Sequence, residues 1–92
     1  MAKVKLNKAF TMDVVDVRKG MQEIADHLVS EEGMKYRWVN DDRLEFSHKT
    51  GKGSLQIEGK ELVLELKISM LYAAAAPLVK KKVMAFADEY IS

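Results

Sequence analysis

The fold is decided by the stretch from Met34 to Ile68, whose sequence is MKYRWVNDDRLEFSHKTGKGSLQIEGKELVLELKI. Apolar and polar residues alternate along it with almost no interruption, a pattern typical of strands that bury one face. Because successive side chains of a strand point to opposite faces, the alternation predicts one apolar face made of Met34, Tyr36, Trp38, Leu44, Phe46, Leu55, Ile57, Leu62, Leu64, Leu66 and Ile68. We expect these residues to build the core of the protein.

Turn residues divide this stretch into four predicted strands, at residues 34–40, 43–49, 54–58 and 61–68. The residues Asn40–Asp42 favour a first turn, and Gly51-Lys52-Gly53 is interpreted as a second. Gly59-Lys60 is a two-residue hairpin signal with glycine first, as a type II′ turn prefers. Links this short make consecutive strands antiparallel neighbours.

Elements of a different kind precede this stretch. Residues 3–7 alternate as a short first strand, and from Asp13 onward the apolar spacing becomes helical. The apolar stripe of this first helix consists of Val14, Val17, Met21, Ile24, Ala25 and Leu28. Asp13 or Thr11 is placed to cap the helix, and Gly33 is placed to end it.

A second helix is predicted after the strands. Its apolar stripe consists of Val79, Val83, Phe86, Ala87 and Tyr90. Pro77 can open this helix as its first residue, or the helix starts near Leu71 and kinks at Pro77. We favour the longer, kinked helix because residues 73–76 are alanines, which are strong helix formers.

The predicted order is therefore β-α-β-β-β-β-α, in a single α+β domain that spans residues 1–92. The strands are expected to form a five-stranded, mostly antiparallel sheet. This sheet has one apolar face and each helix has one apolar stripe, so both helices should pack on that face. The opposite face is left open to water or to a partner.

Composition excludes several classes of protein. The chain has no cysteine, so disulfides, thiolate nucleophiles and thiolate metal sites are excluded. The first residues lack the apolar stretch of a secretory signal. The longest charge-free run, Ile68–Val79, is shorter than the about 20 residues that span a bilayer, so no transmembrane segment is expected. A net charge of +1 gives no bulk reason to expect a nucleic acid or an anionic membrane as partner.

No motif predicts catalysis, a cofactor or a metal site. His27 and His48 fall on different elements, and a zinc site needs three or four ligands, so both are expected to be solvated or capping residues. Asp41 and Asp42 lie in a predicted turn, where neither carboxyl would be tuned for acid–base chemistry. Gly51-x-Gly53 has neither the dinucleotide-binding nor the P-loop spacing. We therefore expect a protein that is not an enzyme.

The polar side of the predicted sheet has an excess of basic residues. These are Lys3, Lys5, Lys35, Arg37, Arg43, Lys49 and Lys67, against the acidic residues Glu45, Glu58 and Glu65. Such a face is either solvated or bound to an anionic partner. Nucleic acid is not expected, because sheets that bind it usually interleave aromatic residues for stacking, and Tyr36 and Trp38 point to the core side.

Two further groups are candidate contacts for a partner or a ligand. The first consists of aromatic residues of the apolar face, namely Tyr36, Trp38 and Phe46. These rings either fill the core or line a pocket under the second helix. The other group lies in the uncharged run Ile68–Val79 and consists of Met70, Leu71 and Tyr72. This run is either a buried helix start or an apolar docking surface.

The order and spacing of several motifs resemble one known family. These motifs are Tyr36-x-Trp38, Asp42-x-Leu44-x-Phe46, Gly51-x-Gly53, and Leu62–Lys67 running into an apolar helix start and Pro77. In this order they resemble the polyhydroxyalkanoic acid system family, small bacterial proteins named for gene regions linked to storage-polyester granules. The likeness covers nearly the whole chain. The element order also resembles a reduced helix-grip (START-like) fold, which by itself implies no ligand.

The resemblance implies a cytoplasmic accessory protein that binds a granule surface or a granule protein through apolar contacts. The family has no established catalytic residues, so the resemblance assigns none here. The alternative is a carrier of an acyl or hydroxyacyl group, held between the sheet and the second helix against Trp38 and Phe46. A homodimer through the first strand is also open, because a strand at the edge of a sheet has unpaired backbone groups.

Overall fold

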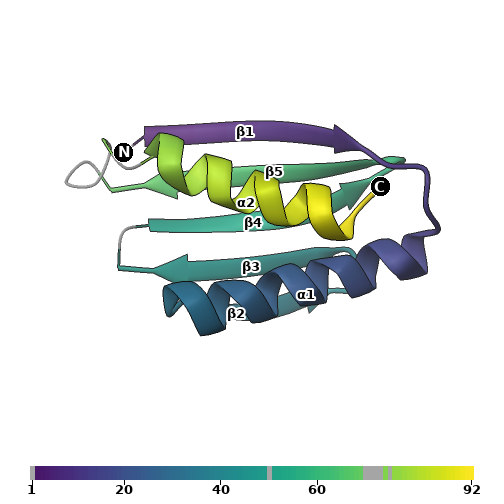
Figure 1. The fold of residues 1–92 in the computed structure, drawn as a ribbon, viewed down its shortest axis with the longest axis horizontal. Helices are drawn as coiled ribbons and strands as arrows, with labels where there is room; N and C mark the ends of the chain where they lie inside the picture. Colours follow the sequence, from purple (N-terminus) through teal and green to yellow (C-terminus); the bar gives the residue numbers. More distant parts are fainter. Residues whose placement is uncertain (1, 50, 70–73, 75) are drawn as a thin grey trace.

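The computed structural model describes residues 2–49, 51–69, 74 and 76–92 (Figure 1). Along the chain these residues form β1 (Ala2–Ala9), α1 (Val14–Glu32), β2 (Lys35–Asn40), β3 (Arg43–His48), β4 (Gly51–Glu58), β5 (Glu61–Ile68) and α2 (Ala76–Tyr90). The order β-α-β-β-β-β-α confirms the α+β fold predicted from the sequence.

The strands form one five-stranded sheet in the order β1-β5-β4-β3-β2. Every neighbouring pair is antiparallel. β1 and β2 therefore lie at the two edges, while β5, β4 and β3 are each paired on both sides. The short turns predicted between β2 and β3 and between β4 and β5 place consecutive strands side by side, as expected.

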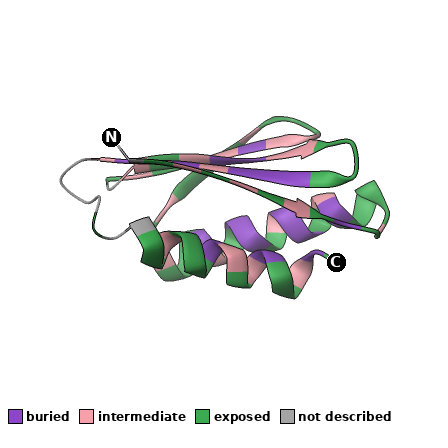
Figure 2. Ribbon diagram, turned by 90° about the horizontal axis from the view of Figure 1, so that it is seen from above, coloured by how far each residue is buried: buried purple, intermediate pink, exposed green. Residues whose placement is uncertain are grey.

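Both helices cover the same face of the sheet. In Figure 1, α1 crosses in front of β3 and β2, and α2 lies in front of β5 and β4. Figure 2 shows the two helices as one layer on one side of the sheet, with the other side uncovered. The predicted two-layer arrangement, with one open face, is confirmed.

The strand register shows that the predicted apolar set shares the helix-covered face. One row across the sheet consists of Val4, Leu66, Gly53, Phe46 and Tyr36. Side chains in one cross-strand row point to the same face. A slip of one residue would turn the whole set of each strand to solvent, so the apolar pattern fixes this register.

The helix-covered face and the helical stripes form one core. Its fully buried large side chains are Val17, Met21, Ile24 and Leu28 from α1, Leu44, Leu55 and Leu66 from the sheet, and Val83 and Ile91 from α2 and the residue after it. Burying one such side chain stabilises the fold by about 1.5–3 kcal/mol. Val14, predicted in the stripe of α1, is instead 37% exposed, because it opens the helix beyond the edge of this core.

The ends of α1 follow the predicted signals. Asp13 is the N-cap residue, and its backbone carbonyl accepts a hydrogen bond from the Val17 N–H (3.0 Å), although its side chain forms no capping bond. Gly33 ends the helix in the left-handed conformation (φ 66°), which glycine adopts without a steric penalty. Gly20 sits where the helices touch. A Cβ there would lie 2.7 Å from the Tyr90 carbonyl oxygen.

The interpretation of Gly51-Lys52-Gly53 as a turn is wrong. β4 begins at Gly51, and Gly51 already pairs with His48 on β3 and with Ile68 on β5. The two glycines are required for close approach. A Cβ at Gly53 would lie 2.7 Å from two ring atoms of Phe46, and one at Gly51 would overlap the Lys67 backbone carbonyl. Lys52, between them, therefore belongs to the open face of the sheet.

The start of α2 and the position of Tyr36 were also predicted from the sequence. Pro77 is the second residue of α2 as described, which agrees with a proline in the first turn. The favoured start near Leu71 falls on residues outside the described part of the chain. Tyr36 was expected in the core but is 38% exposed, because β2 is an edge strand and its outer side lacks a neighbour.

Candidate functional site

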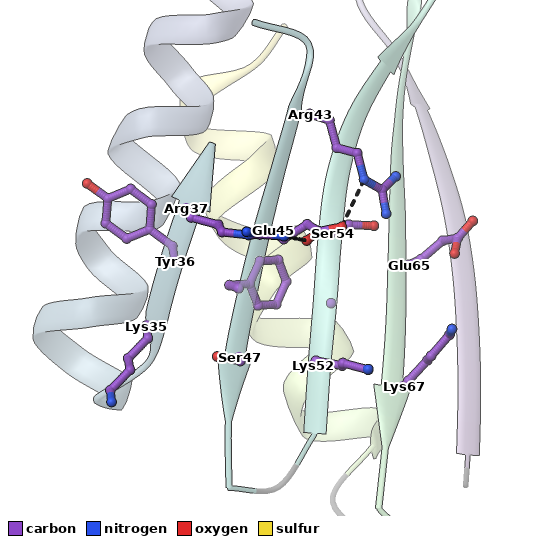
Figure 3. Close-up of a pocket in the computed structure, with 12 residues that line it drawn as sticks. Lys35, Tyr36, Arg37, Arg43, Glu45, Ser47, Lys52, Ser54, Glu65 and Lys67 are labelled. Atoms are coloured by element: carbon purple, nitrogen blue, oxygen red, sulfur yellow. Dashed lines mark hydrogen bonds and ion pairs between the residues drawn. The ribbon is translucent and has the colours of Figure 1, made fainter. Parts of the chain in front are cut away.

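The open face of the sheet contains a hollow of about 460 Å³. Its lining residues come from β2, β3, β4 and β5, and Figure 3 shows them from the side opposite the helices. Among them are the basic residues Lys35, Arg37, Arg43, Lys52 and Lys67 and the acidic residues Glu45 and Glu65. The hollow is therefore a predominantly basic site on the face that the helices leave uncovered.

The hollow exists because small residues form its floor. Ser47, Gly53 and Ser54 lie on the two middle strands, and Ser54 is buried to 5% exposure. The longer side chains stand around them on β2, β3, β4 and β5. Because Gly53 has no side chain, the Phe46 ring below it also reaches the lining. The floor thus combines hydroxyl groups with one aromatic edge.

One cross-strand row of this face is made almost entirely of lysines. From β1 to β2 it consists of Lys3, Lys67, Lys52, Ser47 and Lys35. Lys3 lies directly opposite Lys67, and Lys67 lies directly opposite Lys52. Among the residues that the structure describes, none forms an ion pair with these lysines. The row therefore places four like charges across the sheet without a direct ion pair among the described residues.

The adjacent row differs because its charges are paired. Glu45 lies 3.1 Å from the Arg43 Nε and 3.4 Å from an Arg37 terminal nitrogen (Figure 3). The hydrogen bond from Arg43, assisted by Arg37, holds the pKa of Glu45 below its usual value of 4.5. Glu65 faces Lys5 at 4.0 Å. The two arginines are thus occupied, and the lysine row is the free cationic part of the hollow.

Most of this basic face follows from strand parity in the sequence, but Lys52 does not. The glycines on both sides made the segment look like a turn, so no face was assigned to Lys52. Counting back from the buried Leu55 at two-residue intervals would have placed Gly53 and Gly51 on the core side and Lys52 on the open side. Lys49, assigned to the open face from its sequence parity, lies instead in the turn after β3.

In the part of the chain that the structure describes, the aromatic candidates Tyr36, Trp38 and Phe46 are held by packing and hydrogen bonds on the helix side of the sheet. The Trp38 Nε1–H donates to Gln22 Oε1 on α1 (2.9 Å), and the Gln22 amide nitrogen donates to the Tyr36 hydroxyl (3.0 Å). These two rings therefore attach β2 to α1. Phe46 is 4% exposed and belongs to the core. On the helix side of the sheet, these three residues hold the fold together. Only atoms of Phe46 and Tyr36 also line the hollow on the open face.

The cavity found between the sheet and α2 is too small for a ligand. Lined by Phe46, Ile68 and Val79 among others, it has a volume of about 10 Å³, which holds at most one water molecule. Small-molecule sites usually have volumes of about 300–1,000 Å³. Even the smallest of these is about thirty times larger than this cavity. Among the described residues, the space beside Phe46 therefore agrees with the other reading of these rings, in which they fill the core, and does not support the alternative of an acyl pocket.

The uncharged run Ile68–Val79 has mixed exposure where it is described. Ile68 is buried, Val79 is half-buried, and Leu78 is 72% exposed in the first turn of α2. The candidate contacts Met70, Leu71 and Tyr72 lie outside the described residues. Leu78 is thus the strongest apolar feature of this run that the structure places on the surface.

His27 has a role that the sequence did not suggest. Its ring stacks on Phe86 and Tyr90 of α2, with ring centroids 5.0 and 5.4 Å apart. Its Nε2 lies 2.5 Å from the Tyr90 hydroxyl, and its Nδ1 lies 3.3 Å from Glu31. His27 is therefore partly solvated, with 35% of its side chain exposed, and its ring also packs against α2, a contact that the sequence did not indicate. Within the described residues, no three metal-ligating side chains come together.

The protein is an α+β protein in which two helices cover one face of a single antiparallel sheet. The other face has the open basic hollow. A family model described as "Putative polyhydroxyalkanoic acid system protein" matches residues 4–91, and the chain belongs to this family. This confirms the resemblance carried by the sequence motifs. A search of curated proteins finds no match. Among the described residues, no helix has the length and apolar character needed to cross a membrane.

Proposed function

We propose that this protein is a non-enzymatic accessory component of the polyhydroxyalkanoate storage-granule system in the bacterial cytoplasm. It would contact the polyester surface through apolar side chains at the start of α2. The family assignment over residues 4–91 supplies the biological context. The single structural observation that supports the contact is the exposure of Leu78.

The surroundings of Leu78 favour contact with an apolar surface. Among the described residues it is the most exposed large hydrophobic side chain. Pro77 beside it is also exposed, and the uncharged run Ile68–Val79 contains both residues. Transfer of one leucine side chain from water to an apolar surface is favourable by about 1.5–3 kcal/mol. Exposed Lys80 and Lys81 follow directly and keep the next part of the helix in water.

A non-catalytic role is supported by where titratable groups are perturbed. Shifted pKa values occur at Glu45, which is hydrogen-bonded to Arg43, and at Lys82, which pairs with Glu32. Burial raises the pKa of Tyr90 at the contact between the helices. None of these shifts moves an acid or a base toward neutrality, which general acid–base catalysis requires. The observed shifts instead reflect ion pairs and helix packing.

The test is co-sedimentation with polyester granules that have been stripped of their coat proteins. We expect wild-type protein to sediment with the granules and the Leu78→Asp variant to be depleted several-fold. The matched control is Val15→Asp, a similarly exposed valine (58%) near the start of α1, at the opposite end of the molecule (Figure 1). This control should sediment like the wild type.

Other outcomes would contradict the proposal. Equal sedimentation of Leu78→Asp and wild type would remove the role of this contact. Binding to native granules but not to stripped ones would identify a granule protein as the partner in place of the polymer. A homodimer through β1 remains a separate prediction, because β1 lies at an edge of the sheet. Sedimentation-equilibrium measurements would test it.

A further inference from the structure

The lysine row of the open face has an electrostatic cost in the isolated protein. Like charges directly opposite each other on neighbouring strands are destabilising. Lys67 faces such a neighbour on both sides, Lys3 on β1 and Lys52 on β4. The adjacent row shows the usual solution, in which Glu45 and Glu65 sit beside basic residues. A bound anion would compensate the lysine row in the same way.

The hollow also gives such an anion a place of suitable size. Its volume of about 460 Å³ lies within the range of small-molecule sites. Lys52 and Lys67 stand next to each other along one side of it (Figure 3). The Ser47 hydroxyl belongs to the same cross-strand row, and the Phe46 ring, although 4% exposed, borders the hollow beside Gly53. Charged, hydroxyl and apolar contacts are thus available within one depression.

We propose that this hollow binds a small organic anion, with its carboxylate or phosphate head group between the ammonium groups of Lys52 and Lys67. The hydroxyl of Ser47 and the edge of Phe46 would contact the body of the ligand. A lysine ammonium group acts as a point charge and can bind either a carboxylate or a phosphate. This site lies on the face opposite the helices and does not depend on the granule contact proposed for Leu78.

The geometry favours a compact anion over a nucleic acid. The carboxylates of Glu45 and Glu65 lie in the row next to the lysines and would repel a phosphate chain that ran along the strands. Binding of single strands also relies on exposed aromatic platforms. On this face Phe46 is 4% exposed, and the Tyr36 hydroxyl accepts a hydrogen bond from Gln22 on the helix side. A head group confined to the lysine row avoids the acidic row.

The experiment is isothermal titration calorimetry of the full chain at low ionic strength with separate probes. The first is inorganic phosphate, and the second is 3-hydroxybutyrate, chosen because the family takes its name from polymers of hydroxyalkanoic acids. We expect at least one probe to bind, and its affinity to fall as salt is added. Each of the variants Lys52→Gln and Lys67→Gln should weaken binding about tenfold, because each removes one charge-assisted hydrogen bond.

Two variants make the result specific. Lys60→Gln removes the same charge from the exposed turn between β4 and β5, at the far end of the sheet, and should leave binding unchanged. Ser47→Leu fills the hollow at an exposed position, so it should weaken binding without unfolding the protein. Preference for phosphate or for the hydroxy acid would identify the head group, and either preference supports the site.

Three outcomes would overturn the proposal. The first is no measurable binding of either probe at millimolar concentration. The second is an equal loss of affinity in Lys60→Gln, which would indicate a general charge effect. The third is tighter binding of a single-stranded oligonucleotide than of either small anion, which would make the face a nucleic-acid surface. None of these outcomes affects the granule test with Leu78→Asp, so the two proposals fail independently.

Discussion

The two faces of the sheet are formed by the same strands, but helices cover one face and leave the other open. On the helix-covered face, the described side chains pack into a core, and the cavity found next to α2 has a volume of about 10 Å³. On the open face, small residues leave a hollow of about 460 Å³ bordered by lysines. In this chain the apolar alternation therefore marks where the structure is held together. Space for a ligand lies on the face that the alternation leaves polar.

The largest difference in stability between the two faces is expected at the centre of the covered face. Leu55 on β4 is completely buried, so Leu55→Ala should lower the free energy of unfolding by about 2–5 kcal/mol through lost burial and a new cavity. Ser47→Ala, on the exposed side of the neighbouring strand β3, should change it by less than about 0.5 kcal/mol. Urea denaturation of both variants measures the difference. Similar losses would show that the two faces are not distinct.

Gly53 tests the boundary between the two faces. A Cβ at this position would lie 2.7 Å from the Phe46 ring and from the Glu65 carbonyl oxygen, so something must shift. Gly53→Ala should therefore lower the free energy of unfolding by about 1–3 kcal/mol, as other overpacked sites do. Thermal unfolding monitored by circular dichroism measures this loss. A neutral or stabilising result would mean that Phe46 moves freely and that the floor of the hollow is not fixed.

One substitution on the open face is expected to stabilise the protein. Lys52→Glu replaces a like-charged neighbour of Lys67 with an opposite one. The free energy of unfolding should rise by about 0.2–1 kcal/mol in the absence of ligand, and the gain should shrink in high salt. Lys60→Glu, in the turn after β4, serves as the control and should show no such gain. A loss of stability in Lys52→Glu would contradict the cost that we assign to the lysine row.

The smallest expected effect concerns the paired row. The hydrogen bond from Arg43 lowers the pKa of Glu45 below 4.5 in the folded protein. The stability that this carboxylate contributes is therefore present above the pKa of the unfolded chain and is lost as the pH falls through the lower, folded value. A carboxyl-detected NMR titration should place the Glu45 midpoint below 4.5, and Arg43→Met should raise it. An unchanged midpoint in this variant would rule out Arg43 as the main cause.

The fold could be predicted almost completely because its signals are local. Alternation fixed which side chains share a face, and Gly33 and Asp13 marked the ends of α1 where the structure has them. The failures come from contacts between distant elements. The glycines of β4 look like a turn until Phe46 is known to lie against Gly53. Likewise, the placement of His27 depends on α2, more than fifty residues further along the chain.

The candidate site was predicted only in part for the same reason. Strand parity indicated a basic face, but the hollow depends on which small residues become neighbours across β3 and β4. Ser47 and Lys52 lie side by side only in the paired register. Of the two interpretations left open for the aromatic residues under α2, the described residues support the core. Phe46 packs in the core, and Trp38 packs against it and donates a hydrogen bond to Gln22.

The most direct test of the difference between the faces is a ¹⁵N-HSQC titration of the labelled protein with phosphate and with 3-hydroxybutyrate. We predict that amide shifts concentrate on the open-face segments around Ser47, Lys52 and Lys67. Amides of the covered core, such as those of Leu28 and Val83, should stay in place. Shifts confined to the residues beneath the helices would contradict the account, because they would show that a ligand enters the face we describe as filled.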